Sequence, residues 1–426
     1  MKKKVFILDH ELISPIAVGQ ENSVAALLSN ATADRQIQSF DVSGLPFQHA
    51  AEVREELRSL YESESEKVKA VCKVDRKLEL LAAAYGKAAN RLAPLIEKLD
   101  PQRTGVILGV GAEMIPLKEN EEIVTNAIRA GKNAISELVI QLNTTSDRLN
   151  FIANPYDVYS LYLAEKFGAG AFQKTVLTAC VSSTQAIAQG YDAIARNQAD
   201  VVIAGGTDSI INLIALISFG KLGVIAETDG KISCRPFDAN RYGTIAGEAA
   251  GFVILASEDF VSTHQLKPIA QLLGYGNTLD AYKITAPDPA GTQMAKAISN
   301  ALKNAALAPE EIDYYYAHGT GTRQNDGTEL DAFKMALGHP ASTIPISSTK
   351  DRHGHAIAAA GIQELSLLLS CMKEGIIPGN LNLIHPIDPL LNLVRENTKM
   401  TIKHALTSNF SFGGINTVLA VKNELE

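Results

Sequence analysis

The hydrophobic positions of the first 260 residues alternate between short apolar runs and longer segments with apolar residues at helical spacing. The short runs predict buried strands at 5–8, 104–113 (where the strand runs into a glycine loop), 175–179, 200–206 and 249–255. The longer segments predict amphipathic helices at 22–28, 78–92, 156–167 and from 182 onward. We expect Pro94 to end the second of these helices, because proline cannot donate the next backbone hydrogen bond.

The same alternation returns after residue 260. Strands are predicted near 269–274 and at 313–317, 344–347, 403–410 and 416–421, and helices at 292–306, 327–337 and 355–372. Strands that alternate with helices predict a mostly parallel sheet that is covered on both faces. A polar stretch at 263–267 joins the two halves without a flexible linker, so we expect them to pack as one body.

Composition narrows the class of protein. Of the 426 residues, 46% are hydrophobic and 20% are charged, so the chain can bury a large core. A net charge of −8 argues against nucleic acid as the main partner. No run of about 18 apolar residues is present, which predicts no membrane-spanning helix. Asp9 and His10 interrupt the first apolar run too early for a signal peptide, and we expect a cytoplasmic protein.

Cys180 differs from the other three cysteines in its setting. The four cysteines have no CxxC spacing, so neither a zinc site nor a disulfide framework is predicted. The strand at 175–179 and the helix from Ser182 place Cys180 on the turn between them, where free N–H groups and the helix dipole favour a thiolate. The alternative for any single cysteine is a buried core thiol. The histidines further along the chain favour a nucleophile.

Two histidines follow predicted strands directly. His318 begins a glycine loop after the strand at 313–317, and His355 follows the strand at 344–347 together with Lys350. Open α/β sheets build their sites at such strand ends. His353 and His355 could suggest a metal pair, but no carboxylate or cysteine cluster completes a coordination shell, and we expect no metal and no organic cofactor.

A nucleophilic cysteine with two histidines suits acyl-thioester chemistry. The thiolate accepts an acyl group, and neutral histidines donate hydrogen bonds to a thioester carbonyl. The same hydrogen bonds stabilise the enolate that forms when a carboxylate leaves as CO₂.

Four motifs, in this order, resemble the elongating β-ketoacyl–acyl carrier protein synthases of the thiolase superfamily. They are Thr178-Ala-Cys180, His318-Gly-Thr-Gly-Thr322, Lys350 with His355 five positions later, and Phe412-Gly-Gly-Ile-Asn416. The resemblance runs nearly end to end. It implies a thiolase-like αβαβα layered fold of two pseudo-repeated halves, 1–260 with the cysteine and 261–426 with the histidines, the lysine and a gating loop.

The resemblance also implies roles for individual residues. Cys180 would accept the acyl chain, His318 and His355 would form the decarboxylation pair, and Lys350 would be the electrostatic partner and orienter near His355. The N–H groups of Cys180 and Phe412 would form the oxyanion hole, with the Phe412 side chain guarding the pocket. Further implied positions are the rest of the gating loop (Ser411 and Gly413), the supporting carboxylates (Glu364, Asp326 and Glu329) and a basic face for the carrier (Lys73, Arg76 and Lys77). The carboxylates could equally have a structural role, in which they hold loops by hydrogen bonds. The basic residues could instead be an ordinary run of charges that faces the solvent and binds no carrier.

The implied reaction is a decarboxylative Claisen condensation of a cysteine-bound acyl chain with malonyl–acyl carrier protein, in fatty acid or polyketide-type biosynthesis. The partners are then acyl carrier proteins and a second subunit, in a homodimer or in a heterodimer with a chain-length factor. Two alternatives stay open. A biosynthetic thiolase would use a second cysteine as base where this chain has a histidine, and a non-catalytic chain-length subunit usually lacks the cysteine. A cysteine protease fits poorly because no orienting asparagine or aspartate motif is found.

Three stretches depart from the family pattern. Ser411 and Ala358 stand where the family has glycine, and 154–157 differs from the usual apolar sequence. Because serine restricts φ relative to glycine, Ser411 predicts a stiffer gate and slower or more selective acyl loading. A neutral change, with Ser411 at negative φ, is the alternative. Together the departures favour a divergent enzyme of specialised metabolism.

Overall fold

The computed structural model describes residues 3–111, 126, 129–132, 156–227 and 234–425. Most described strands form one twisted sheet with the order β11-β10-β14-β15-β9-β1-β8-β7-β5-β6. One half of this path consists of β1 (Val5–Ser14), β8 (Ala246–Ser257), β7 (Val201–Ser209), β5 (Thr104–Val110) and β6 (Phe172–Val176). The other half consists of β9 (Ala270–Leu279), β15 (Ile415–Asn423), β14 (His404–Phe410), β10 (Tyr314–Tyr316) and β11 (Ile346–Ser347).

The two halves of the sheet repeat one pairing pattern. In each, the first two ladders are antiparallel and the next two are parallel: β1/β8/β7/β5/β6 corresponds to β9/β15/β14/β10/β11. An antiparallel ladder between β1 and β9 joins them, with Val5 opposite Leu272. The prediction of a mostly parallel sheet is therefore wrong at the centre. β14 and β15 form a hairpin across the glycine loop, and a connection that short allows only antiparallel neighbours.

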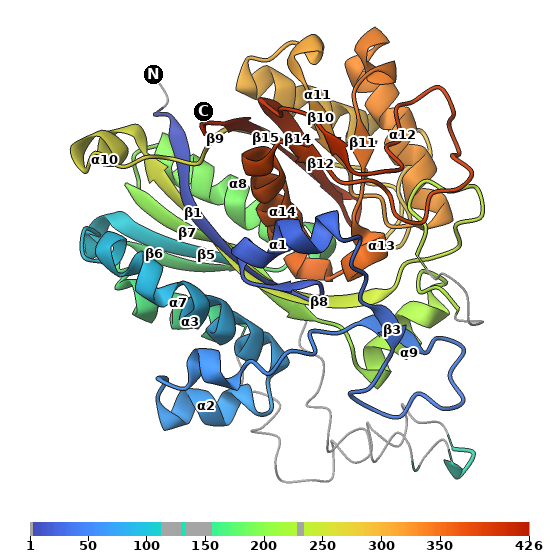
Figure 1. Ribbon diagram of the computed structural model, residues 1–426, viewed down its shortest axis with the longest axis horizontal. Helices are drawn as coiled ribbons and strands as arrows, with labels where there is room; N and C mark the ends of the chain where they lie inside the picture. The colour runs from blue at the N-terminus through green and yellow to red at the C-terminus, as the bar shows by residue number, and fades with distance from the viewer. Residues whose placement is uncertain (1–2, 112–125, 127–128, 133–155, 228–233, 426) are drawn as a thin grey trace.

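Helices form three layers, and the two halves of the sheet lie between them as two β layers (Figure 1). The middle layer contains α8 (Ser182–Ala195) and α14 (Ala360–Glu374), which contact each other and strands of both halves. One outer layer contains α3 (Arg76–Ile96) and α7 (Val158–Phe167), and the other contains α11 (Thr292–Ala305) and α12 (Arg323–Leu337). Three apolar clusters fill the spaces between these layers. The expected αβαβα layering is confirmed.

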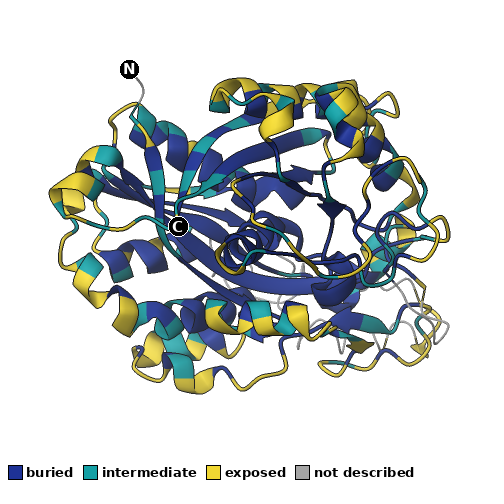
Figure 2. Ribbon diagram, turned by 45° about the horizontal axis from the view of Figure 1, so that its top comes forward, coloured by how far each residue is buried: buried dark blue, intermediate teal, exposed yellow. Residues whose placement is uncertain are grey.

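Shorter helices decorate the edges of these layers. They are α1 (Gln20–Leu28), α2 (Glu66–Cys72), α9 (Leu213–Lys221), α10 (Glu258–Thr263) and α13 (Lys350–His353). Most strands of the large sheet and both middle helices are largely buried, and the exposed positions gather on the outer helices and loops (Figure 2). None of the described helices is both long and apolar enough to cross a membrane.

Several predicted boundaries shift by a few residues. Pro94 does not end α3, which continues to Ile96, because a proline in the last turn removes only one hydrogen bond. The strand predicted at 175–179 is β6 at Phe172–Val176, and a 3₁₀ turn at Ala179–Val181 follows. The helix predicted from His355 begins only at Ala360. His355 therefore lies in the loop between α13 and α14 and not in a helix.

Candidate active site

Cys180 lies on a tight turn that leads directly into α8. Ala179, the residue before it, has φ 51°, a left-handed conformation that is strained for a residue with a side chain. Ser182 braces the turn, because its hydroxyl accepts from Thr178 N at 2.9 Å and donates to Ala179 O at 2.7 Å. Gly109 on β5 lets the helix start pack closely, since a Cβ there would lie 2.3 Å from Ser183 N. The turn holds the thiol at the bottom of a cavity with only 7% of the residue exposed.

The resting state of Cys180 is a thiol, contrary to the thiolate that the helix start predicted. Burial raises the pKa of Cys180 to about 12, although Lys350 and the backbone N–H groups of Phe412 and Cys180 act in the opposite direction. The loss of hydration around the sulfur raises the pKa more than the backbone N–H groups at the helix start lower it, because a buried anion is poorly solvated. The thiol therefore needs a proton acceptor at the moment of attack.

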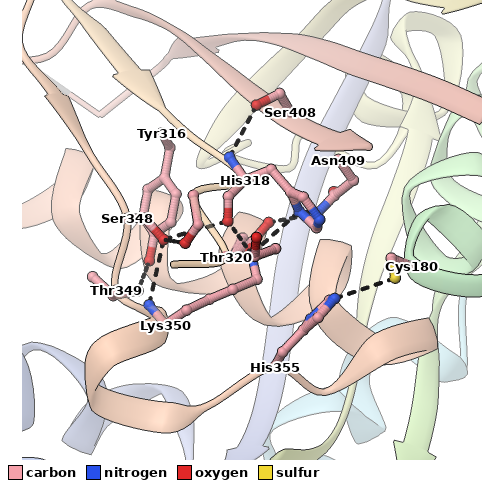
Figure 3. A network of polar contacts seen from close by, with 12 residues as sticks. Cys180, Tyr316, His318, Thr320, Ser348, Thr349, Lys350, His355, Ser408 and Asn409 are labelled. Atoms are coloured by element: carbon pink, nitrogen blue, oxygen red, sulfur yellow. Dashed lines mark hydrogen bonds and ion pairs between the residues drawn. The ribbon is translucent and has the colours of Figure 1, made fainter. Parts of the chain in front are cut away.

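His355 and His318 both face the thiol (Figure 3). The Nε2 atom of His355 lies 3.2 Å from Cys180 Sγ. The rings of the two histidines are 5.2 Å apart at 81°. Burial, and next the charge of Lys350, hold the pKa of each histidine well below its usual value. Both are therefore neutral near pH 7, as the proposed enolate chemistry requires.

The two histidines differ in how their second ring nitrogen is held. His318 Nδ1 lies 3.2 Å from Lys350 Nζ and 3.2 Å from Asn409 Nδ2, both of which are donors. Nδ1 must then accept, and the ring proton is on Nε2, which opposes metal ligation by that atom. His355 Nδ1 has no hydrogen-bond partner among the described residues. His318 is thus fixed as a donor toward the cavity, whereas the tautomer of His355 is free.

Lys350 contacts and orients His318. The family resemblance had indicated His355 as its partner. Lys350 Nζ donates to His318 O at 2.5 Å as well as to the ring, and it forms an ion pair with Glu364. Both side chains of the pair are only 1% exposed. Burial raises the pKa of Glu364 to about 7, against the stabilising charge of Lys350. The contact with Glu364 therefore holds Lys350 beside His318.

Asp326 and Glu329 hold the glycine loop after His318. Glu329 accepts from the backbone N–H groups of His318 and Gly319, each at 2.8 Å. Asp326 accepts from Phe237 N at 2.8 Å and Gly321 N at 3.1 Å. Neither carboxylate contacts the reacting atoms, so the geometry favours the loop-holding alternative.

The loop after β14 brings Phe412 against the site. Its backbone N–H stabilises the Cys180 thiolate form, and its ring stacks on Phe219 with centroids 6.4 Å apart. Ser411 has an ordinary negative φ, and its hydroxyl donates to Phe412 O at 2.9 Å. The positive φ values fall instead on Gly413 (83°) and Gly414 (74°). The structure thus supports the neutral alternative for Ser411.

Of the other two positions that depart from the family pattern, Ala358 causes no visible structural change. Ala358 is buried without a positive φ, and its N–H donates to Asp208 at 3.0 Å. Half of the stretch 154–157 lies outside the described residues, which resume at Tyr156.

A cavity of about 880 Å³ opens onto the three reacting side chains. Apolar groups line much of it, among them Phe47, Ile210, Phe219, Ile357 and Phe412. A volume of this size can enclose an acyl chain, which is the kind of ligand that apolar walls favour.

The three cations of the predicted basic face for a carrier differ in how far they are exposed. Lys77 is only 7% exposed, with its Nζ 5.3 Å from the centre of the Tyr159 ring. Arg76 binds Glu248 at 2.8 Å and Glu79 at 2.6 Å, so its charge is already paired. Of the three, only Lys73 is exposed. The sequence showed three cations within five positions, but it did not show which of these side chains face the solvent.

Asn409 and Thr184 belong to the site although sequence reasoning missed them. Both are completely buried, on β14 and α8 respectively. The available signal was a polar residue in an apolar strand next to a glycine loop, and a second one a turn after the cysteine. Such residues are also common in ordinary cores, so only their contacts reveal the connection.

A buried cysteine that faces two neutral histidines in an apolar cavity is the site of an enzyme that handles acyl thioesters. The chain matches the family models for the N-terminal domain (residues 2–260) and the C-terminal domain (residues 269–384) of beta-ketoacyl synthase. It is 29% identical to 3-oxoacyl-[acyl-carrier-protein] synthase 2 of Synechocystis, over 99% of this chain and 98% of that protein. The chain therefore belongs to the β-ketoacyl synthase family.

Solved structures show the same thiolase-like fold. The ishigamide ketosynthase/chain length factor superposes with a TM-score of 0.82 at 25% identity, covering 99% of this chain and 100% of that one. A type II polyketide synthase acyl carrier protein in complex with its ketosynthase bound to the hexaketide gives a TM-score of 0.81 at 24% identity, with the same coverage.

Proposed function

We propose that this protein is a β-ketoacyl–acyl carrier protein synthase that condenses a cysteine-bound acyl chain with malonyl–carrier protein. The observation that carries the proposal is the Cys180 thiol with His355 at 3.2 Å and His318 fixed as a donor beside it, inside an apolar cavity. The fold and the family support the same reaction class. A non-catalytic subunit does not need this arrangement, and a thiolase would need a second cysteine, whereas no other described cysteine lines the cavity.

In the first half-reaction, His355 Nε2 takes the proton of the Cys180 thiol as the sulfur attacks the acyl thioester. The N–H groups of Cys180 and Phe412 stabilise the tetrahedral oxyanion. As the carbon–sulfur bond to the carrier breaks, the protonated His355 returns its proton to the departing carrier thiol. The products are acyl-Cys180 and free carrier, and His355 is neutral again.

In the second half-reaction, the malonyl thioester carbonyl accepts hydrogen bonds from Nε2–H of His318 and of His355. The carboxylate leaves as CO₂, and its bonding electrons form the enolate. The enolate carbon attacks the acyl-Cys180 carbonyl, and the thiolate that leaves is reprotonated from solvent. The free tautomer of His355 allows this histidine to accept a proton in one step and donate a hydrogen bond in the other.

The proposal is tested by incubating the purified protein with acyl– and malonyl–carrier proteins. We expect the intact mass to rise by one acyl group, CO₂ to be released on adding malonyl–carrier protein, and a β-ketoacyl carrier two carbons longer to form. Acylation without any chain extension, for every acyl group from short to long, would contradict the proposal.

The carrier would approach the cavity mouth rather than the face at Lys73. Lys221, at the end of α9, and Arg323, at the start of α12, both line the cavity and are exposed. Two cations at the rim can attract an acidic carrier protein and increase the rate of encounter. A second subunit, identical or a chain-length factor, completes the proposed assembly.

Reversing the rim charges should weaken carrier binding selectively. The double variant Lys221→Glu with Arg323→Glu should raise KM for carrier-bound substrates about tenfold at low salt, since each lost surface ion pair accounts for up to about 1 kcal/mol. Short free thioesters should react as before. The matched control, Lys267→Glu with Lys303→Glu, makes the same charge change at exposed positions outside the cavity. An equal rise in KM in both double variants would show a general charge effect and contradict this docking site.

A further inference from the structure

A buried hydrogen-bond relay joins the helix of the nucleophile to the ring of His318. The Thr184 hydroxyl, one turn after Cys180 on α8, donates to Asn409 Oδ1. The amide group of Asn409 then donates to Glu364 at 2.7 Å and to His318 Nδ1 at 3.2 Å. All four residues are at most 1% exposed.

The orientation of the Asn409 amide, together with Lys350 Nζ, sets which ring nitrogen of His318 carries the proton. With its NH₂ group toward Nδ1, the ring nitrogen must accept, and Nε2–H points at the cavity. A flipped amide would place its oxygen beside Nδ1 and leave Lys350 Nζ as the one donor to that nitrogen among the described residues, which weakens the preference for a proton on Nε2. In molecules with the opposite tautomer, Nε2 lacks the proton that a developing enolate oxygen needs.

The relay is packed so closely that water cannot replace one of its members. Gly361 on α14 lies directly over it: a Cβ on that glycine would be 1.9 Å from Thr184 Oγ1 and 3.0 Å from Asn409 Oδ1. If the hydroxyl is removed, the amide oxygen stays buried without a donor. The present amide orientation would then lose its partner on α8.

We propose that Thr184 is a positioning residue that, by fixing the amide of Asn409, acts with Lys350 to keep His318 in its Nε2–H tautomer. The inference rests on the proposed function only for its kinetic consequence. The effect on the tautomer follows from the hydrogen bonds alone.

The kinetic test is Thr184→Val, which keeps the side-chain shape and removes the donor. We expect kcat for malonyl decarboxylation to fall about tenfold, less than the loss of a whole enolate-stabilising donor. KM for malonyl–carrier protein and the acylation rate of Cys180 should not change, because Thr184 contacts neither. Thr184→Ser keeps the hydroxyl and should restore kcat.

The matched control is Thr407→Val on β14. Thr407 is also buried, two residues from Asn409, but its hydroxyl has no partner among the described residues. This variant removes a hydroxyl of the same kind outside the relay, and its kcat should equal that of the natural protein.

A second readout does not depend on activity. Nitrogen NMR of ¹⁵N-histidine-labelled protein, with His318→Gln to assign the signals, should show an unprotonated Nδ1 and a protonated Nε2 for His318. In Thr184→Val, signal from the opposite tautomer should appear. An unchanged His318 tautomer in folded Thr184→Val overturns the inference. An altered tautomer in a protein that condenses nothing would instead contradict the proposed function and leave the relay in place.

Discussion

A Cys180→Ala variant is expected to form no acyl adduct and to lose condensation by about 10⁶-fold, the scale of loss when a catalytic nucleophile is removed. The reason is that Cys180 Sγ alone among the described cysteines opens on the cavity beside a proton acceptor. Release of CO₂ from malonyl thioester should continue, because His318 and His355 remain in place. Intact mass, product analysis and CO₂ release measure the three quantities separately.

The other described cysteines are the internal control for this result. Cys72, Cys234 and Cys371 are all buried, and burial raises the pKa of each. Peptide mapping of the acylated natural protein should find no adduct on them. An adduct on any of these three cysteines, with Cys180 unmodified, would contradict the assignment of the nucleophile.

The two histidines are expected to separate the half-reactions. His318→Ala should lower decarboxylation by about 10²–10³-fold, the effect of losing one such donor, while acylation of Cys180 continues. His355→Ala should impair both steps, because the Cys180 thiol, with a pKa of about 12, also loses the proton acceptor 3.2 Å away. Single-turnover acylation and CO₂ release, measured on each variant, test the division.

The pH dependence of His355→Ala provides a further check on the same division. Without the histidine, acylation depends on the small fraction of thiolate. Below a pKa of about 12, that fraction rises about tenfold for each pH unit, so the acylation rate should rise with the same slope. His404→Ala, which removes a histidine remote from the cavity, is the control. A flat pH profile in His355→Ala would mean that Cys180 is ionised by something other than His355.

The sequence predicted most of the secondary structure because the two hydrophobic periods are strong in this chain. The central parts of β5, β7 and β8 (106–108, 201–204 and 249–256) are unbroken apolar runs, and such runs are buried whatever their neighbours are. Sheet order and strand direction needed the structure. Strand pairing joins residues far apart in the chain, such as Val5 with Leu272, and no local pattern encodes that choice.

For the site, the sequence by itself determined which groups could do chemistry: a cysteine at a helix start, and histidines after strands or beside glycine loops. Local geometry is enough for that, since a turn fixes which side chains are presented. The tertiary structure decided their ionisation and orientation. Burial reversed the expected thiolate of Cys180, Glu248 paired the charge of Arg76, and Lys350 with Asn409 fixed the tautomer of His318. Each of these outcomes depends on desolvation or on a partner that is distant in sequence, and both arise only when the layers pack together.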